Sequence, residues 1–100
     1  MEQLFDENFI KELGLDKLPE KERDEIISSL LEIFSKRLFI RLIKNLNQEQ
    51  AEKLNKIMED ENNVFSVIEF LAKNVPDYDL IVEDEIKAFK TEAIDFVKNR

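Results

Sequence analysis

The segment from Ile26 to Leu46 constrains the fold of this chain most, because it is apolar on more than one side. Twelve of its 21 residues are apolar. A helix on the surface of a globular protein needs only one apolar stripe. At about 100° per residue, one face of this segment already carries a complete stripe: Ile27, Leu30, Leu31, Phe34, Leu38 and Leu42. We therefore expect the segment to be covered from at least two directions.

A second apolar stripe lies about a third of a turn away on the same segment. Ile26, Ile33 and Ile40 recur every seven residues, and Ile43 follows on the remaining side. A fully buried isoleucine is worth about 1.5–3 kcal/mol, so leaving several exposed would be costly. Two interpretations are open: other helices of the same chain cover these four residues, or another chain does. The four are therefore the candidate interface.

Turn and capping residues divide the chain into five expected helices. Asp6 can cap a first helix that Gly14 ends, Asn47 and Gln50 resemble a capping box, and Asp77 follows a break at Pro76. The expected ranges are about 6–13, 19–46, 48–58, 63–74 and 78–98. Strand-type alternation is absent. The prediction is an all-α fold, a compact bundle around a long central helix at about 19–46, with residues 1–100 as a single domain.

Two further apolar patterns predict which sides of the later helices face inward. In the fourth helix the apolar residues expected to face inward are Val64, Val67, Ile68, Leu71 and Val75, and Phe65, Phe70 and Ala72 widen this face. For the fifth helix they are Tyr78, Ile81, Val82, Ile86, Phe89, Ala93, Phe96 and Val97.

The composition argues against an enzyme. The chain has no His and no Cys, which removes the usual general base at neutral pH, thiolate chemistry and common zinc sites. A single Gly does not allow a phosphate-binding loop. The acidic run from Asp77 to Glu85 lacks the Gly and Glu spacing of a calcium loop, and acids early in a helix favour its dipole. We expect no catalytic residue, no cofactor and no metal.

The net charge of −8 limits the partners. Residues 59–85 hold nine acids and one base, and such a surface repels phosphate backbones and anionic lipid. We expect no direct nucleic-acid binding and no membrane association, since every apolar run is too short to span a bilayer. The lack of cysteine and of a signal-like N-terminal run favours a cytoplasmic location.

Two arginines lie between the apolar stripes of the long helix. Arg37 and Arg41 are one turn apart, and a buried unpaired guanidinium is costly. The corner before the fifth helix offers the carboxylates of Asp77, Asp79 and Glu83. One hypothesis is an internal ion-pair cluster of these five residues. The alternative is an exposed arginine pair that binds an acidic partner.

The order of several short motifs resembles a family of short, acidic, all-helical bacterial proteins known only as a domain of unknown function. The motifs are Leu13-Gly14-Leu15, Leu18-Pro19-Glu20-Lys21-Glu22, Arg37 with Arg41-Leu42, Leu46-Asn47-Gln48-Glu49-Gln50 and Asn74-Val75-Pro76-Asp77-Tyr78. They extend from about Phe5 to Glu92. The family has Ser where this chain has Asn47, which still caps a helix. The resemblance implies one compact domain, and it implies no activity or site residues.

The function expected from these observations is a small non-enzymatic protein–protein interaction module. Its partner is either another protein or a second copy, and the homodimer would form through the second helix. The alternative is an acidic inhibitor or nucleic-acid mimic that occupies a basic groove on a partner protein. In that case the acids of residues 59–85 should form one continuous stripe, and binding should weaken steeply with salt.

Overall fold

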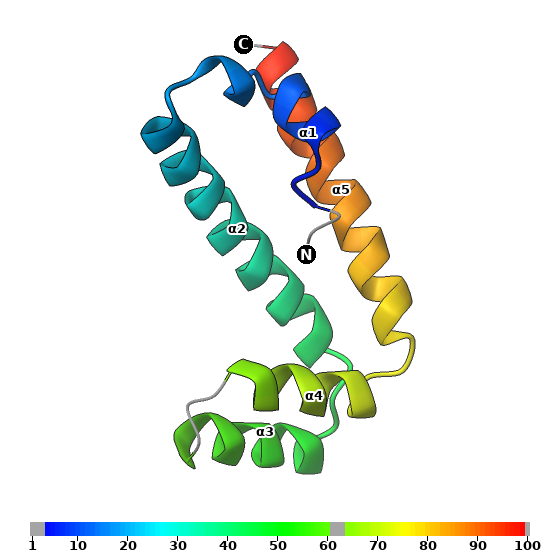
Figure 1. Ribbon diagram of the computed structural model, residues 1–100. Coiled ribbons are helices and arrows are strands. Elements are labelled where there is room, and N and C mark those ends of the chain that lie inside the picture. The colour runs from blue at the N-terminus through cyan, green and yellow to red at the C-terminus, as the bar shows by residue number, and fades with distance from the viewer. Residues whose placement is uncertain (1–3, 61–63, 100) are drawn as a thin grey trace. The chain divides into compact units, whose positions relative to one another are not determined.

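The computed structural model describes residues 4–60 and 64–99 and contains only helices and their connections there. These residues form five α-helices and one 3₁₀ helix, and the α-helices are labelled in Figure 1. Their bounds are α1 Glu7–Glu12, η1 Leu15–Lys17, α2 Glu20–Ile43, α3 Gln48–Asp60, α4 Val64–Asn74 and α5 Tyr78–Lys98. The all-α prediction is therefore confirmed for the described residues. None of these helices is long and apolar enough to cross a membrane.

The chain divides into two compact units, and both α2 and α5 contribute residues to each unit. The first unit comprises Met1–Lys36 and Glu83–Arg100, and the second comprises Arg37–Val82. Each unit has its own buried apolar residues. The prediction of a single domain stays a prediction.

The core of the first unit forms around two phenylalanines from distant parts of the sequence. Phe34 of α2 and Phe89 of α5 meet edge to face, with ring centroids 5.5 Å apart and an interplanar angle of 72°. This is a favoured geometry for aromatic pairs. Leu4, Phe9 and Leu15 are also buried in this unit. Segments 55 residues apart in the sequence are thus joined by one aromatic contact.

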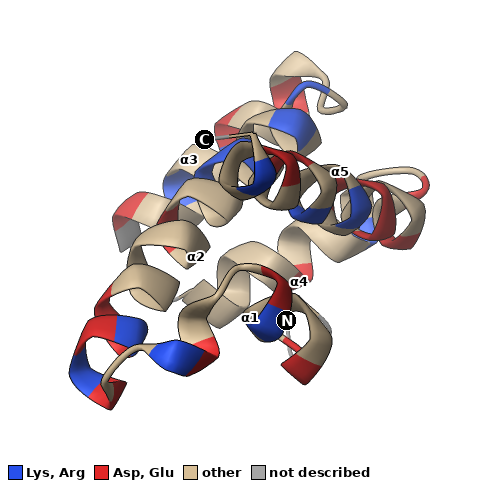
Figure 2. Cartoon of the chain, turned by 90° about the horizontal axis from the view of Figure 1, so that it is seen from above, with Lys and Arg blue, Asp and Glu red and all other residues tan. Residues whose placement is uncertain are grey.

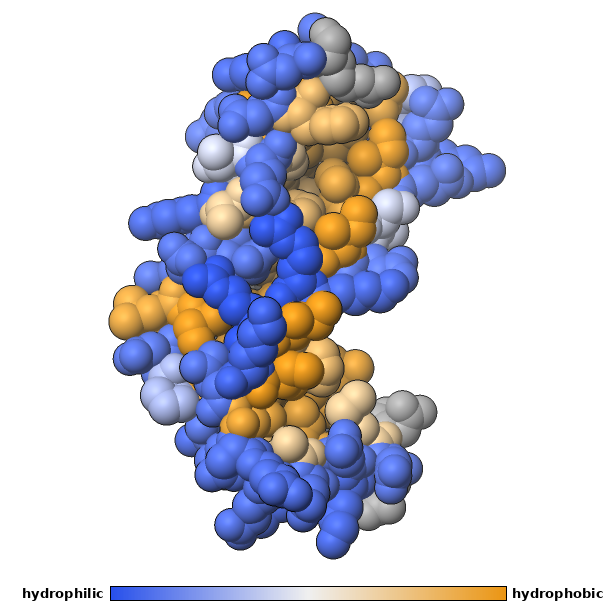
Figure 3. Space-filling model, turned by 180° about the vertical axis from the view of Figure 1, so that it is seen from behind, coloured by the Kyte–Doolittle hydropathy of each residue, from blue (hydrophilic) through white to orange (hydrophobic). Residues whose placement is uncertain are grey.

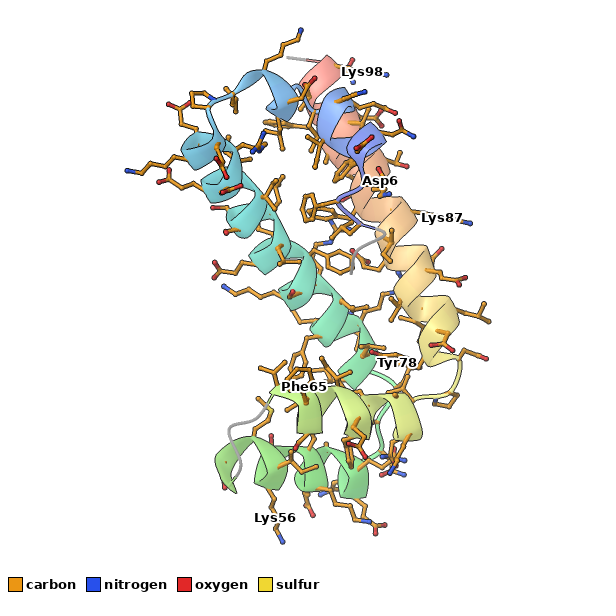
Figure 4. The ribbon with its side chains drawn as sticks, viewed as in Figure 1. Asp6, Lys56, Phe65, Tyr78, Lys87 and Lys98 are labelled. Atoms are coloured by element: carbon orange, nitrogen blue, oxygen red, sulfur yellow. The ribbon has the colours of Figure 1, made fainter. Side chains whose placement is uncertain are left out.

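The short helix α1 is held to α5 by a charged residue that also caps it. Asp6 Oδ1 accepts a hydrogen bond from the Phe9 amide at 2.8 Å, as expected for the N-cap. Asp6 Oδ2 pairs with Lys90 Nζ at 3.1 Å, and this ammonium lies 5.5 Å from the centroid of the Phe9 ring (Figure 4). The amide hydrogen bond, then the lysine, lower the pKa of Asp6 below its ordinary value of 3.8. Gly14 ends this segment with φ 77°, the left-handed conformation that was predicted.

The second unit contains α3 and α4, which contact each other along their lengths (Figure 1). The predicted capping box is confirmed in both directions. The Gln50 amide donates to Asn47 Oδ1 at 2.8 Å, and the Asn47 amide donates to Gln50 Oε1 at 3.0 Å. Leu54 and Leu71 are buried here, as are Leu38 and Leu42 at the end of α2.

The C-terminal end of the long helix differs in detail from the expected range. The long helix ends at Ile43 rather than at Leu46, because the Asn45 side chain donates to the Arg41 carbonyl at 3.1 Å and its amide donates to Leu42 O. At the other break, α5 begins directly after Asp77, as predicted. Asp77 has φ 60°, a left-handed conformation that Asp tolerates better than most residues. The predicted start of the fourth helix at Asn63 lies outside the described residues.

The inward faces predicted for α4 and α5 are partly wrong. Val64 and Ile68 of α4 are exposed, as is Phe96 near the end of α5, at 69%. Phe89 and Leu71 are buried as expected. Periodicity identifies the face of a helix that can be buried, but a turn near a helix end is covered only where another element extends that far.

Removing the carboxylate of Asp6 should destabilise the first unit. We expect Asp6→Ala to lower the urea midpoint more than Asp6→Asn, because the amide oxygen of Asn can still cap α1 but cannot pair with Lys90. Since the folded pKa of Asp6 is lowered, the stability that its charge contributes is present above pH 3.8 and is lost as the pH falls through the lower folded value. The difference between wild type and Asp6→Asn should shrink over that range. Equal urea midpoints for wild type and Asp6→Asn at neutral pH would contradict a stabilising role of the Asp6–Lys90 pair.

Breaking the capping box should destabilise the second unit. Asn47→Ala removes the oxygen that accepts the Gln50 amide, and loss of such a cap typically costs about 1 kcal/mol. The matched control is Asn55→Ala, which makes the same chemical change at an exposed position inside α3 and should be neutral or slightly stabilising. Chemical unfolding followed by circular dichroism compares them, and a cost at Asn55 as large as at Asn47 would argue against the cap.

Candidate functional site

Two of the predicted interface isoleucines lie exposed on α2 within the first unit. Ile26 is 38% exposed and Ile33 is 50% exposed. In the second unit, Ile40 is 52% exposed, whereas Ile43 is half-buried. Three of the four candidates thus present apolar surface that the described helices do not cover, and Ile43 is partly covered.

The exposure of Ile33 follows from the burial of its neighbour. Phe34 is 0% exposed because it packs on Phe89. Adjacent residues in a helix point about 100° apart, so Ile33 lies to one side of that contact, where it is half exposed. Within the first unit, Phe34 is the fully buried residue of its stripe, Ile27 and Leu30 are half-buried, and Leu31 is exposed at 36%, whereas Ile26 and Ile33 of the second stripe are both exposed.

The exposed side of α2 in the first unit also carries polar residues that the sequence patterns did not single out. Glu22, Ser29 and Lys36 are all exposed, and at about 100° per residue they fall on the same side of the helix as Ile26 and Ile33. Lys36 makes an ion pair with Glu32 at 3.1 Å, one turn away on the same helix. Helical-wheel placement of polar as well as apolar residues would have identified this face.

Other apolar side chains reach the surface, and orange areas among blue ones are visible in Figure 3. In the second unit they come mainly from the α3–α4 region. The exposed residues there are Met58, Val64, Phe65 and Ile68, and Leu80 of α5 is exposed in the same unit. Ile68 lies four residues after Val64 and three after Phe65 in α4, so these three form a second exposed apolar group on one side of that helix.

The structure brings part of the predicted ion-pair cluster into one unit. Arg37 and Arg41 are half-buried and belong to the second unit together with Asp77 and Asp79, which are exposed, whereas Glu83 belongs to the first unit. The two aspartates line a surface hollow of about 420 Å³. Its other lining residues are Ala72, Val75, Tyr78 and Leu80. The five-residue cluster stays a prediction.

The carboxylates do not gather into a cation site in the described parts of the chain. No group of three acidic residues is placed to hold a metal ion among them. Glu85 of α5 is buried at 4% exposure in the first unit, and Glu69 of α4 pairs with Lys73 at 3.4 Å. The acids of residues 59–85 thus differ widely in their environments.

Comparison with known families decides the classification of the chain. A family model described as a protein of unknown function (DUF5663) matches residues 9–93. The chain belongs to this family. The predicted resemblance to a domain of unknown function is confirmed, and the DUF5663 match contains α2, α3 and α4 completely. No curated protein and no solved structure shows a significant match to the chain.

Reversing the charge of Arg37 distinguishes the two interpretations of the arginine pair in this DUF5663 chain. We expect Arg37→Glu to lower the melting temperature, because a half-buried position that accommodates a cation would receive an anion. Lys56→Glu makes the same charge change on an exposed side chain of α3 that points into solvent (Figure 4), and it should leave the melting temperature nearly unchanged. A melting temperature for Arg37→Glu equal to that of the control would favour the exposed pair that binds an acidic partner.

Proposed function

We propose that this protein is a non-enzymatic interaction module that binds a protein partner through the exposed face of α2. The observation that carries the proposal is the contrast between adjacent residues: Phe34 is completely buried, and Ile33 is 50% exposed. Ile26 repeats that exposure two turns earlier in the same unit. A cytoplasmic location is part of this proposal and rests on the absence of cysteine.

Energetics favour a binding role for this isoleucine pair, Ile26 and Ile33. Full burial of an isoleucine side chain contributes about 1.5–3 kcal/mol relative to exposure, so covering the remaining exposed area of two residues gives a useful part of a binding free energy. Side chains at the centre of protein interfaces are typically apolar and surrounded by polar ones. Glu22, Ser29 and Lys36 supply such a surrounding on α2.

The acidic inhibitor or nucleic-acid mimic receives less support from the described residues. A mimic needs a continuous row of exposed carboxylates, yet Glu85 is buried. Lys87, Lys90 and Lys98 lie among acids in the later part of α5, where blue and red alternate in Figure 2, whereas residues 78–85 carry acids and no base. The burial of Glu85 interrupts the row of exposed acids in α5, and the isoleucine pair is therefore the better candidate for a contact surface.

Site-specific photo-cross-linking tests the proposal. A benzophenone amino acid replaces either Ile26 or, as a control, Ser28. Ser28 is exposed and lies about 160° from Ile26 around α2. We expect a covalent protein adduct from position 26 and none from position 28. Adding Ile33→Asp should abolish the adduct from position 26, because a charge would enter the apolar contact.

The folding of these variants is checked by circular dichroism and chemical unfolding. Ile33→Asp at an exposed position should change the free energy of unfolding by about 0.5 kcal/mol or less, whereas Phe34→Ala next to it should cost about 3–5 kcal/mol. Adducts of equal yield from positions 26 and 28, or an adduct that survives Ile33→Asp in a folded protein, would contradict the proposed surface.

A further inference from the structure

The exposed face of α2 in the first unit has a sequence that reads almost symmetrically, apart from the sign of its charges. We define this α2 face as Glu22, Ile26, Ser29, Ile33 and Lys36. All five residues are exposed, and at about 100° per residue they fall within an arc of about 80°. From one end to the other the face presents an acid, an isoleucine, a small residue, an isoleucine and a base.

We propose that the α2 face binds a second copy of this chain in antiparallel orientation, around a two-fold axis at Ser29. This proposal rests on the proposed function and names the partner. Glu22 and Lys36 are each seven residues from Ser29, so reversing one helix places Glu22 of each copy opposite Lys36 of the other. Ile26 and Ile33 lie three and four residues from Ser29, so they meet with an offset of about one residue, or about 1.5 Å.

Charge complementarity favours a second copy of the chain as the partner, with its α2 running antiparallel. A parallel pair would place Glu22 against Glu22 and Lys36 against Lys36, which repel. The antiparallel pair replaces the two repulsions with two symmetry-related copies of one Glu22–Lys36 attraction, as an isologous interface requires. Ser29 at the axis is the smallest residue of the face, so it allows the two helices to approach closely.

The existing contact of Lys36 does not oppose this pairing. Its ion pair with Glu32 joins two side chains that are 72% and 68% exposed. Exposed ion pairs of this kind contribute little and exchange readily with solvent. Lys36 can therefore turn toward Glu22 of the second copy or be shared between the two acids.

Charge reversal at the two ends of the α2 face tests the orientation. We expect Glu22→Lys and Lys36→Glu each to weaken dimerisation about tenfold at low salt, because each puts like charges together twice per dimer. An equimolar mixture of the two variants should recover association as a heterodimer, and the double variant should recover it as a homodimer. Sedimentation equilibrium measures each association constant.

Matched controls are available in α3. Glu49→Lys changes an acid in the first turn of that helix, as Glu22→Lys does in α2. Lys53→Glu disrupts an exposed ion pair with a glutamate four residues earlier, at 3.6 Å, as Lys36→Glu does. Neither control should change the association constant, and circular dichroism should show all four single variants folded.

Disulfide trapping gives a second measurement that does not depend on charge. The chain has no cysteine, so Glu22→Cys and Lys36→Cys each introduce a single thiol. Mixing the two variants under mild oxidation should give mainly the mixed disulfide. Homodisulfides in place of the mixed product would overturn the antiparallel orientation.

A monomeric wild type at its highest soluble concentration would overturn the second copy as the partner. An adduct from position 26 to a different protein would then leave the proposed interaction function standing. Without any adduct from position 26, both proposals fail.

Discussion

The contact between Phe34 and Phe89 fixes the rotation of α2 in the first unit, and the environment of every other residue on that part of the helix depends on it. Because Phe34 is drawn fully into an edge-to-face contact, the side of α2 that carries Ile26 and Ile33 has to face outward. The polar residues on that side follow for the same geometric reason. A core contact thus determines the surface chemistry of the helix.

Local signals in the sequence were sufficient to predict most helix boundaries. Gly14 adopts the left-handed conformation that its position required, and Asn47 with Gln50 forms the reciprocal cap. Each of these signals acts over three or four residues, within the range of local backbone geometry. The early end of α2 escaped prediction because it depends on one side-chain hydrogen bond from Asn45.

The choice between the two apolar stripes of α2 could not be made from the sequence. Both stripes consist of large aliphatic or aromatic residues, and local helix-forming preference does not distinguish between them. Only a partner 55 residues away, Phe89, places Phe34 of the first stripe in the core. The same limitation explains Phe96, which continues the periodic face of α5 but is largely exposed. The candidate interface was predictable as a set of residues, and its exposure was not.

The attachment of α1 to α5 has a consequence for the chemistry of two lysines. The Lys90 side chain is only 24% exposed, and its ammonium pairs with the Asp6 carboxylate and lies over the Phe9 ring. Lys87, one turn away, is exposed (Figure 4). An acylating reagent can reach the amine of Lys87 at all times, but it reaches that of Lys90 fully only when α1 detaches. The ratio of the two acylation rates therefore reports the free energy of detaching α1 while the rest of the unit stays folded.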